Sequence, residues 1–103
     1  MYGNADIQEM PLGVPLFRRK VSDFLEANGL RLEEVDLYLA VLSPDGGILA
    51  GGGLRRDVLK CLAVNEEFRS EGLMTPLVSR LVSEASQRGF NSLKVFTKPA
   101  YRA

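Results

Sequence analysis

One stretch of the chain restricts the fold more than any other, because a buried-strand pattern leads through a short polar segment into a helix pattern. The run Val58–Val64 is almost wholly apolar and predicts a strand. From Leu73 to Arg88 the apolar residues recur at spacings of three and four, which predicts a helix that ends at Gly89. Ser92–Phe96 predicts a further strand. A strand, a helix and a strand in this order predict a parallel crossover unit.

The residues before this unit predict another helix and a β-hairpin. Pro15–Asn28 has one apolar face, a proline suited to a helix start and an Asn-Gly stop. Leu37–Leu42 and Ile48–Leu54 are apolar runs, joined by the turn residues Pro44-Asp45-Gly46-Gly47. The expected fold is therefore α/β, with the element order α-β-β-β-α-β and a mixed sheet flanked by helices.

We expect different structural features near the two ends of the chain. Met1–Gly13 has no periodicity, and we expect a loose lead-in there, followed by one domain over residues 14–103. The chain ends soon after the last expected strand, so we expect a domain whose C-terminal strands are missing. A sheet edge left open in this way predicts strand pairing between copies as a route to a homo-oligomer.

Charge and residue usage exclude several classes of function. Thirteen basic residues balance thirteen acidic ones, so no electrostatic excess attracts nucleic acid or an anionic membrane. The chain has no histidine and one cysteine, which excludes Ser-His-Asp and Cys-His catalysis and metal sites built from imidazoles or several thiolates. No run approaches the roughly 18 apolar residues of a membrane span, and we expect a cytoplasmic protein without a metal.

Three features of the strands each allow more than one interpretation. Gly51-Gly52-Gly53 either clears space for a bound ligand or marks a bulge in the strand. Arg55-Arg56 either contacts an adenosine phosphate or an acidic partner, or forms a solvated turn. Alternation places Lys60 and Cys61 on opposite faces, which makes Lys60 a solvated or carboxylate-paired side chain and Cys61 a core residue rather than a nucleophile.

The polar segment before the second helix is a candidate anion site. The first turn of a helix has N–H groups without internal partners and carries a partial positive charge. No side chain here suits a helix cap, Gly72 lets the backbone approach a ligand, and Arg69 adds charge-assisted contacts. The alternative is an ordinary strand-to-helix turn.

The pattern Arg69-x-x-Gly72-x-Met74 resembles the acetyl-CoA loop of the GNAT acetyltransferases, usually Q/R-x-x-G-x-G/A, with Met74 in place of the small residue. The resemblance implies that loop amides bind the pyrophosphate of CoA and that the preceding strand binds its pantetheine arm through the backbone. The implied pantetheine contacts are Leu62, Ala63 and Val64. The implied pyrophosphate contacts are Arg69, Ser70, Glu71, Gly72, Leu73, Met74 and Thr75.

Three segments resemble one branch of that superfamily, the N-terminal domain of the citrate (pro-3S)-lyase ligases. They are Val58–Val64, Glu71-Gly72-Leu73 and Phe96-Thr97-Lys98-Pro99. Those enzymes use ATP and acetate to acetylate a prosthetic-group thiol on an acyl carrier subunit. The resemblance implies an acetyl-CoA, CoA or phosphopantetheine ligand and an acyl carrier protein as partner, and assigns no catalytic residue. The alternatives are a stand-alone N-acetyltransferase that acts on an amine and a non-catalytic binding or interaction module.

Overall fold

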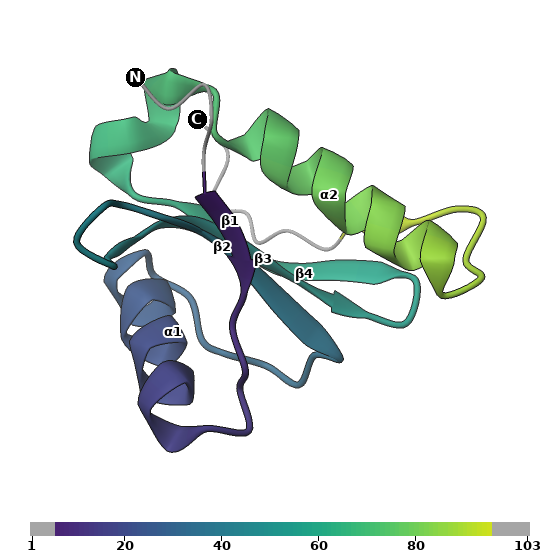
Figure 1. The fold of residues 1–103 in the computed structure, drawn as a ribbon, viewed down its shortest axis with the longest axis horizontal. Coiled ribbons are helices and arrows are strands. Elements are labelled where there is room, and N and C mark those ends of the chain that lie inside the picture. The colour runs from purple at the N-terminus through teal and green to yellow at the C-terminus, as the bar shows by residue number, and fades with distance from the viewer. Residues whose placement is uncertain (1–5, 96–103) are drawn as a thin grey trace.

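The computed structural model describes residues 6–95 as a five-stranded sheet with α1 on one face and α2 on the other (Figure 1). The strands lie in chain order; the first three pairings are antiparallel, and β4 and β5 are parallel. This confirms the expected mixed sheet of the α/β class. The elements are β1 (Asp6–Glu9), α1 (Pro15–Ala27), β2 (Leu37–Leu42), β3 (Ile48–Arg55), β4 (Val58–Val64), the 3-10 helix η1 (Glu66–Glu71), α2 (Met74–Gln87) and β5 (Lys94–Val95).

The expected loose lead-in over Met1–Gly13 is wrong for Asp6–Glu9, which form β1. This strand pairs antiparallel with β2, with Ile7 opposite Val41, and adds an element before the expected order. Met10 follows it into the core at 4% exposure, and its N–H bonds to the Tyr38 carbonyl at 2.7 Å. A four-residue edge strand is held by its backbone ladder and shows too little apolar alternation to be recognised.

Both faces of the sheet are covered, which explains why β2 is apolar at every position. Its odd-numbered residues belong to the core on the α2 side, and Tyr38 and Ala40 belong to the core on the α1 side. The helices contribute one apolar stripe each. The buried residues of α1 are Val21, Phe24 and Leu25, and those of α2 are Leu77, Leu81 and Ala85.

The turn between β2 and β3 has the chemistry that its sequence predicted. The Ser43 hydroxyl and the Gly47 N–H both donate to Asp45 Oδ1, and these hydrogen bonds hold the pKa of the Asp45 carboxyl below its usual value. Gly46 has φ +89°, a conformation that glycine adopts without steric cost.

The three consecutive glycines of β3 make room for the protein's own side chains. A Cβ on Gly51 would lie 2.5 Å from Tyr38 Oη, and one on Gly53 would lie 3.2 Å from Tyr38 Cδ1. On the opposite face, a Cβ on Gly52 would lie 2.4 Å from Leu62 Cδ2. The side chains of Tyr38 and Leu62 therefore occupy the space that the sequence analysis considered for a ligand.

A bulge in β4 accompanies these glycines, so the bulge interpretation is confirmed. Gly53 pairs with Lys60 and Gly51 pairs with Ala63, which leaves two β4 residues, Cys61 and Leu62, opposite Gly52. Cys61 has φ +56°, which is uncommon for a residue other than glycine.

The bulge also corrects the expected placement of Lys60. Lys60 Nζ pairs with Glu33 Oε1 at 2.8 Å, and Cys61 Sγ lies 3.8 Å from the Arg31 carbonyl oxygen. Both side chains thus reach the connection between α1 and β2, because the extra residue interrupts the alternation. The pairing of Lys60 with a carboxylate and the burial of Cys61, at 7% exposure, are confirmed.

Replacing Gly51 by alanine tests the close approach of Tyr38 to β3. We expect Gly51→Ala to lower the free energy of unfolding by about 1–3 kcal/mol, because the added methyl group overpacks a buried site. Urea unfolding followed by circular dichroism measures the change. Gly13→Ala is the matched control, since nothing lies within 4 Å of its Cβ position, and we expect it to stay within about 0.5 kcal/mol of the parent. Equal stability of the two variants would contradict the packing argument.

Candidate functional site

The segment between β4 and α2 is more ordered than the predicted polar loop. After Asn65 the chain forms the 3-10 helix η1, whose first turn closes with a 2.9 Å hydrogen bond from Phe68 N to the Asn65 carbonyl oxygen. Phe68 is half-buried and packs against the core on the α2 side. This aromatic contact gives a short polar segment enough apolar burial to take a defined shape.

Two asparagines fix the start of this segment. Asn65 donates through its backbone N–H to Leu49 O and through Nδ2 to Ile48 O, each at 2.9 Å. Asn28, at the end of α1, donates through Nδ2 to Asn65 Oδ1 at 2.9 Å. The segment is therefore tied to β3 and to α1. The sequence did not predict this pair because Asn28 was interpreted as part of a helix stop signal. The two asparagines also lie 37 residues apart in the chain.

Gly72 and the start of α2 form the exposed end of the segment. Gly72 has φ +73°, and nothing lies within 4 Å of its Cβ position. Leu73 precedes α2 without a side-chain capping bond, and the first turn of α2 has no acidic residue. The N–H groups of this turn are therefore available to an anion that approaches over Gly72.

The side-chain charges of η1 are mixed and exposed. Its six residues include three glutamates and Arg69. Arg69 Nε donates to the Val64 carbonyl oxygen at 3.1 Å, so the guanidinium lies beside the end of β4. Attraction for an anion would come from the helix amides and Arg69, against the charge of Glu71.

The backbone of β4 turns different residues toward and away from β3. Because the Asn65 N–H bonds to Leu49 O and opposite residues alternate in an antiparallel ladder, the peptide groups of Ala63 face Gly51. Those of Val64 face away from β3. Within residues 6–95, β5 pairs with β4 only at Val58 and Leu59, which lie before the bulge.

All ten predicted site residues lie along one continuous path from β4 through η1 into α2. Leu73 is buried and Met74 is half-buried, and both belong to the core on the α2 side, so they can offer a ligand mainly their backbone. Leu62 and Val64 pack against the same core, while Ala63 is buried on the α1 side. The exposed members are Arg69, Ser70, Glu71, Gly72 and Thr75.

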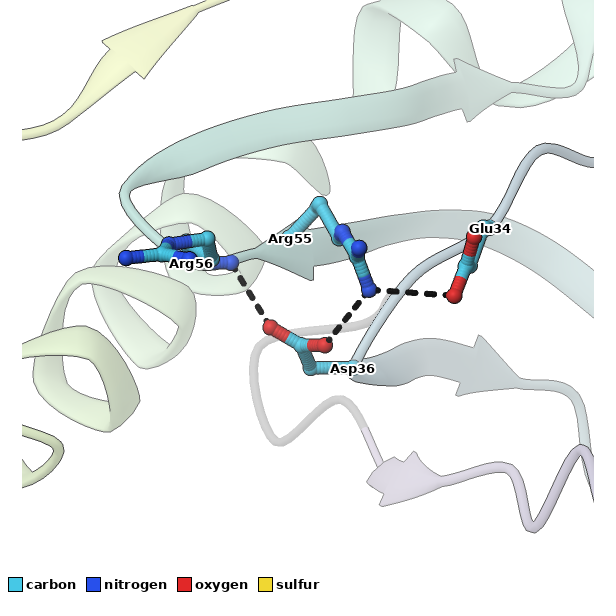
Figure 2. Close-up of polar contacts among 4 residues, drawn as sticks. All are labelled: Glu34, Asp36, Arg55 and Arg56. Atoms are coloured by element: carbon cyan, nitrogen blue, oxygen red, sulfur yellow. Dashed lines mark hydrogen bonds and ion pairs between the residues drawn. The ribbon is translucent and has the colours of Figure 1, made fainter.

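The arginine pair at the other end of β4 has a structural role in the turn (Figure 2). Arg55 Nη1 lies 3.1 Å from Glu34 Oε2 and 3.3 Å from Asp36 Oδ1, and the Arg56 backbone N–H donates to Asp36 Oδ2 at 2.7 Å. These contacts favour the turn interpretation. In residues 6–95 no group of acidic, cysteine or histidine residues could hold a metal, and no helix is long and apolar enough to cross a membrane.

Solved acetyltransferases share this arrangement of helices and strands. One from an uncultured soil metagenomic sample, an aminoglycoside acetyltransferase, superposes with a TM-score of 0.65 and 24% identity over 93% of this chain and 81% of its own. A second, from Exiguobacterium sp. 255-15, has a TM-score of 0.63 and 21% identity over 94% and 78%. The chain has the GNAT fold. The aminoglycoside N-acetyltransferase AAC(6')-Iy, solved in complex with CoA, matches with a TM-score of 0.61 and 17% identity over 91% and 80%.

The sequence is similar to the N-terminal region of citrate (pro-3S)-lyase ligases, as its three segments predicted. It is 27% identical to the ligase of Escherichia coli K12 over all 103 residues, and 33% identical to that of Klebsiella pneumoniae over 87 residues, or 84% of this chain. The chain spans only 29% and 25% of those two proteins, so it corresponds to about a quarter of their length. No protein-family profile matches the chain.

Removing the Asn65 side chain tests whether it anchors the segment. We expect Asn65→Ala to lower the free energy of unfolding by about 1–3 kcal/mol, because it leaves the Ile48 carbonyl and the Asn28 amide without this partner. Chemical unfolding measures the loss, and Asn91→Ala, at an exposed loop position, is the control and stays within about 0.5 kcal/mol. Strict additivity of Asn65→Ala with Asn28→Ala would contradict the shared hydrogen bond.

Proposed function

We propose that this chain binds acetyl-CoA, CoA or a phosphopantetheine group through the segment from β4 to α2, as the GNAT-like domain of a citrate lyase ligase. The observation that carries the proposal is the uncapped start of α2 behind Gly72, a left-handed residue with open space over it. The GNAT fold and the similarity to the ligases over the whole chain support it.

The residues present fit the phosphate end of such a ligand. The pyrophosphate would lie against the backbone N–H groups at the start of α2, those of Leu73, Met74 and Thr75, because the N–H groups of residues 69–71 lie within η1. Arg69 would be the cationic side chain. The side chain of Met74 does not stand in the way, because it packs against the core. The lack of a positive excess in η1 means that affinity would come from directed amide groups more than from bulk charge.

The strand end fits the amide-rich pantetheine arm. Extended backbone recognises an amide group by offering N–H and C=O groups along one edge. In β4 this edge includes the Val64 N–H, which faces away from β3, whereas the Val64 carbonyl oxygen accepts from Arg69 Nε and Ala63 is engaged with Gly51. Leu62 and Val64 are the proposed pantetheine contacts, with Ala63 supporting them. Where the reaction is transfer from acetyl-CoA, its thioester would supply the acetyl group and CoA would leave as the thiol.

The activity that we infer is acyl transfer within a larger ligase, with an acyl carrier protein as partner, in the cytoplasm. The second candidate is transfer of an acetyl group from CoA to an amine, which the fold of the solved acetyltransferases favours. Activity assays on the proposed full-length ligase would decide between the two candidates. Acetylation of a carrier thiol that needs ATP and acetate supports the first candidate, and acetylation of an aminoglycoside or polyamine from acetyl-CoA alone supports the second.

Thermal unfolding with ligands tests the binding site directly. A ligand at a hundred times its dissociation constant adds about 2.7 kcal/mol of stability, and each kcal/mol moves the midpoint of a domain this size by roughly 4–8 °C. We expect CoA and acetyl-CoA to raise the midpoint by about 10 °C or more under these conditions. The 4′-phosphopantetheine arm should give a smaller rise and ATP little. An equal rise with ATP, or none with any ligand in a folded sample, would contradict the proposal.

A pair of matched substitutions tests where the ligand lies on α2. Gly72 and Gly89 flank opposite ends of this helix, both have positive φ, and both have open space at the Cβ position. Asparagine tolerates this conformation, so the two variants should lose similar stability. We expect Gly72→Asn to weaken CoA binding about tenfold or more in isothermal titration calorimetry, because its side chain covers the first-turn amides. Gly89→Asn should leave the affinity unchanged; equal weakening by both variants would place the ligand elsewhere.

A further inference from the structure

Tyr38 makes a buried polar contact that spans the sheet. Its side chain is fully buried on the α1 side, and its hydroxyl donates to the Cys61 carbonyl oxygen at 3.1 Å. To get there from β2 the ring crosses β3 at Gly51, where a Cβ would collide with it, and at Gly53, where a Cβ would lie 3.2 Å from Tyr38 Cδ1 and 2.7 Å from Val35 Cγ1. The ring and these glycines therefore fit one another, and the hydroxyl has a defined acceptor on β4.

The acceptor belongs to the bulge. Cys61 has φ +56°, and such a conformation in a residue other than glycine persists only where neighbouring contacts hold it. The Tyr38 hydroxyl holds its carbonyl, and the Sγ atom lies 3.8 Å from the Arg31 carbonyl oxygen. Contacts from β2 and from the connection between α1 and β2 thus set the position of the bulge along β4.

The position of the bulge decides which backbone groups β4 presents. With the bulge at Cys61 and Leu62, Ala63 lies opposite Gly51 and Val64 turns its peptide groups away from β3. A bulge displaced toward the end of β4 would put Leu62 opposite Gly51 in place of Ala63. That displacement would change which N–H and C=O groups face away from the sheet.

We propose that Tyr38 is a positioning residue for the ligand: its hydroxyl fixes the β4 bulge and so sets which peptide groups at the end of β4, the Val64 N–H among them, face away from β3 toward the pantetheine arm. This inference rests on the proposed function. Tyr38 touches no ligand in this scheme and acts through the Cys61 carbonyl.

Tyr38→Phe isolates the hydroxyl, because it keeps the ring over Gly51 and Gly53. We expect the CoA dissociation constant to rise about three- to tenfold, the range that a lost hydrogen bond of ordinary strength allows. In the protein without CoA, we expect the backbone amides of residues 60–64 to exchange hydrogen faster and to shift in NMR spectra. Gly51→Ala, which displaces the ring, should change both readouts in the same direction.

Val21→Ala is the control for a merely structural role. Val21 is fully buried in the same α1-side core, and its truncation costs at least as much stability as the loss of one hydroxyl. Its CoA dissociation constant should stay within about twofold of the parent, since the Val21 side chain is apolar and makes no hydrogen bond to the Cys61 carbonyl. A rise in Val21→Ala equal to that in Tyr38→Phe would overturn the proposal, as would an unchanged affinity in Tyr38→Phe.

The two readouts separate the failure of this inference from the failure of the proposed function. If the parent chain binds no CoA, the proposed function and its ligand-positioning step both fail, and amide exchange still decides whether Tyr38 holds the bulge. If the parent binds CoA and the exchange of residues 60–64 is unchanged in Tyr38→Phe, the inference alone is overturned.

Discussion

The structure depends most on how one large side chain crosses the sheet. Tyr38 lies over β3 because Gly51 has no side chain and Gly53 leaves room beside the ring, and its hydroxyl donates to the Cys61 carbonyl oxygen on β4 at 3.1 Å. Glycine inside a strand normally weakens it, through lost packing and lost chain entropy. Here the ring fills the space that the glycines leave and adds a buried hydrogen bond. Three neighbouring strands are thereby coupled through one residue of β2.

The same coupling extends toward the candidate site through the end of β4. The bulge sets which residues of β4 lie opposite which residues of β3. Asn65, directly after β4, forms hydrogen bonds to β3 and to Asn28 at the end of α1. Both cores of the sheet therefore take part in placing η1, since Phe68 packs on the α2 side and Asn28 lies on the α1 side. A segment held at Asn65 and at Phe68 can keep the start of α2 in a fixed position, as directed recognition by backbone amides would require.

The sequence predicted those parts of the fold that burial of a regular pattern dictates. The predicted bounds of β2 and β4 match those in the structure because their apolar runs are buried on one or both faces. The predicted bounds of α2 differ from those in the structure by one residue at each end. β1 was missed because its ladder, rather than a pattern of burial, holds it. The bulge and the reason for the glycines could not be predicted, because they follow from the contact of Tyr38 with a residue 23 positions away. The candidate anion-binding segment was predicted from its residues, although its helical form and the Asn28–Asn65 contact were not foreseen. Phe96-Thr97-Lys98-Pro99 lies outside the described residues, so that part of the resemblance rests on sequence alone.

The charge of η1 shapes what kind of ligand the site can select. A small free anion gains little from a segment with three glutamates and one arginine, because bulk attraction is absent. A ligand that also has an amide-bearing arm would gain affinity from hydrogen bonds to the edge of β4 that faces away from β3. The start of α2 and this edge would then both contact the same ligand molecule. The second contact then forms at a high effective concentration, so that neither region needs to be strong alone. If the proposed function holds, the arrangement of β4, η1 and α2 would favour a long, two-part ligand over inorganic phosphate or a short nucleotide.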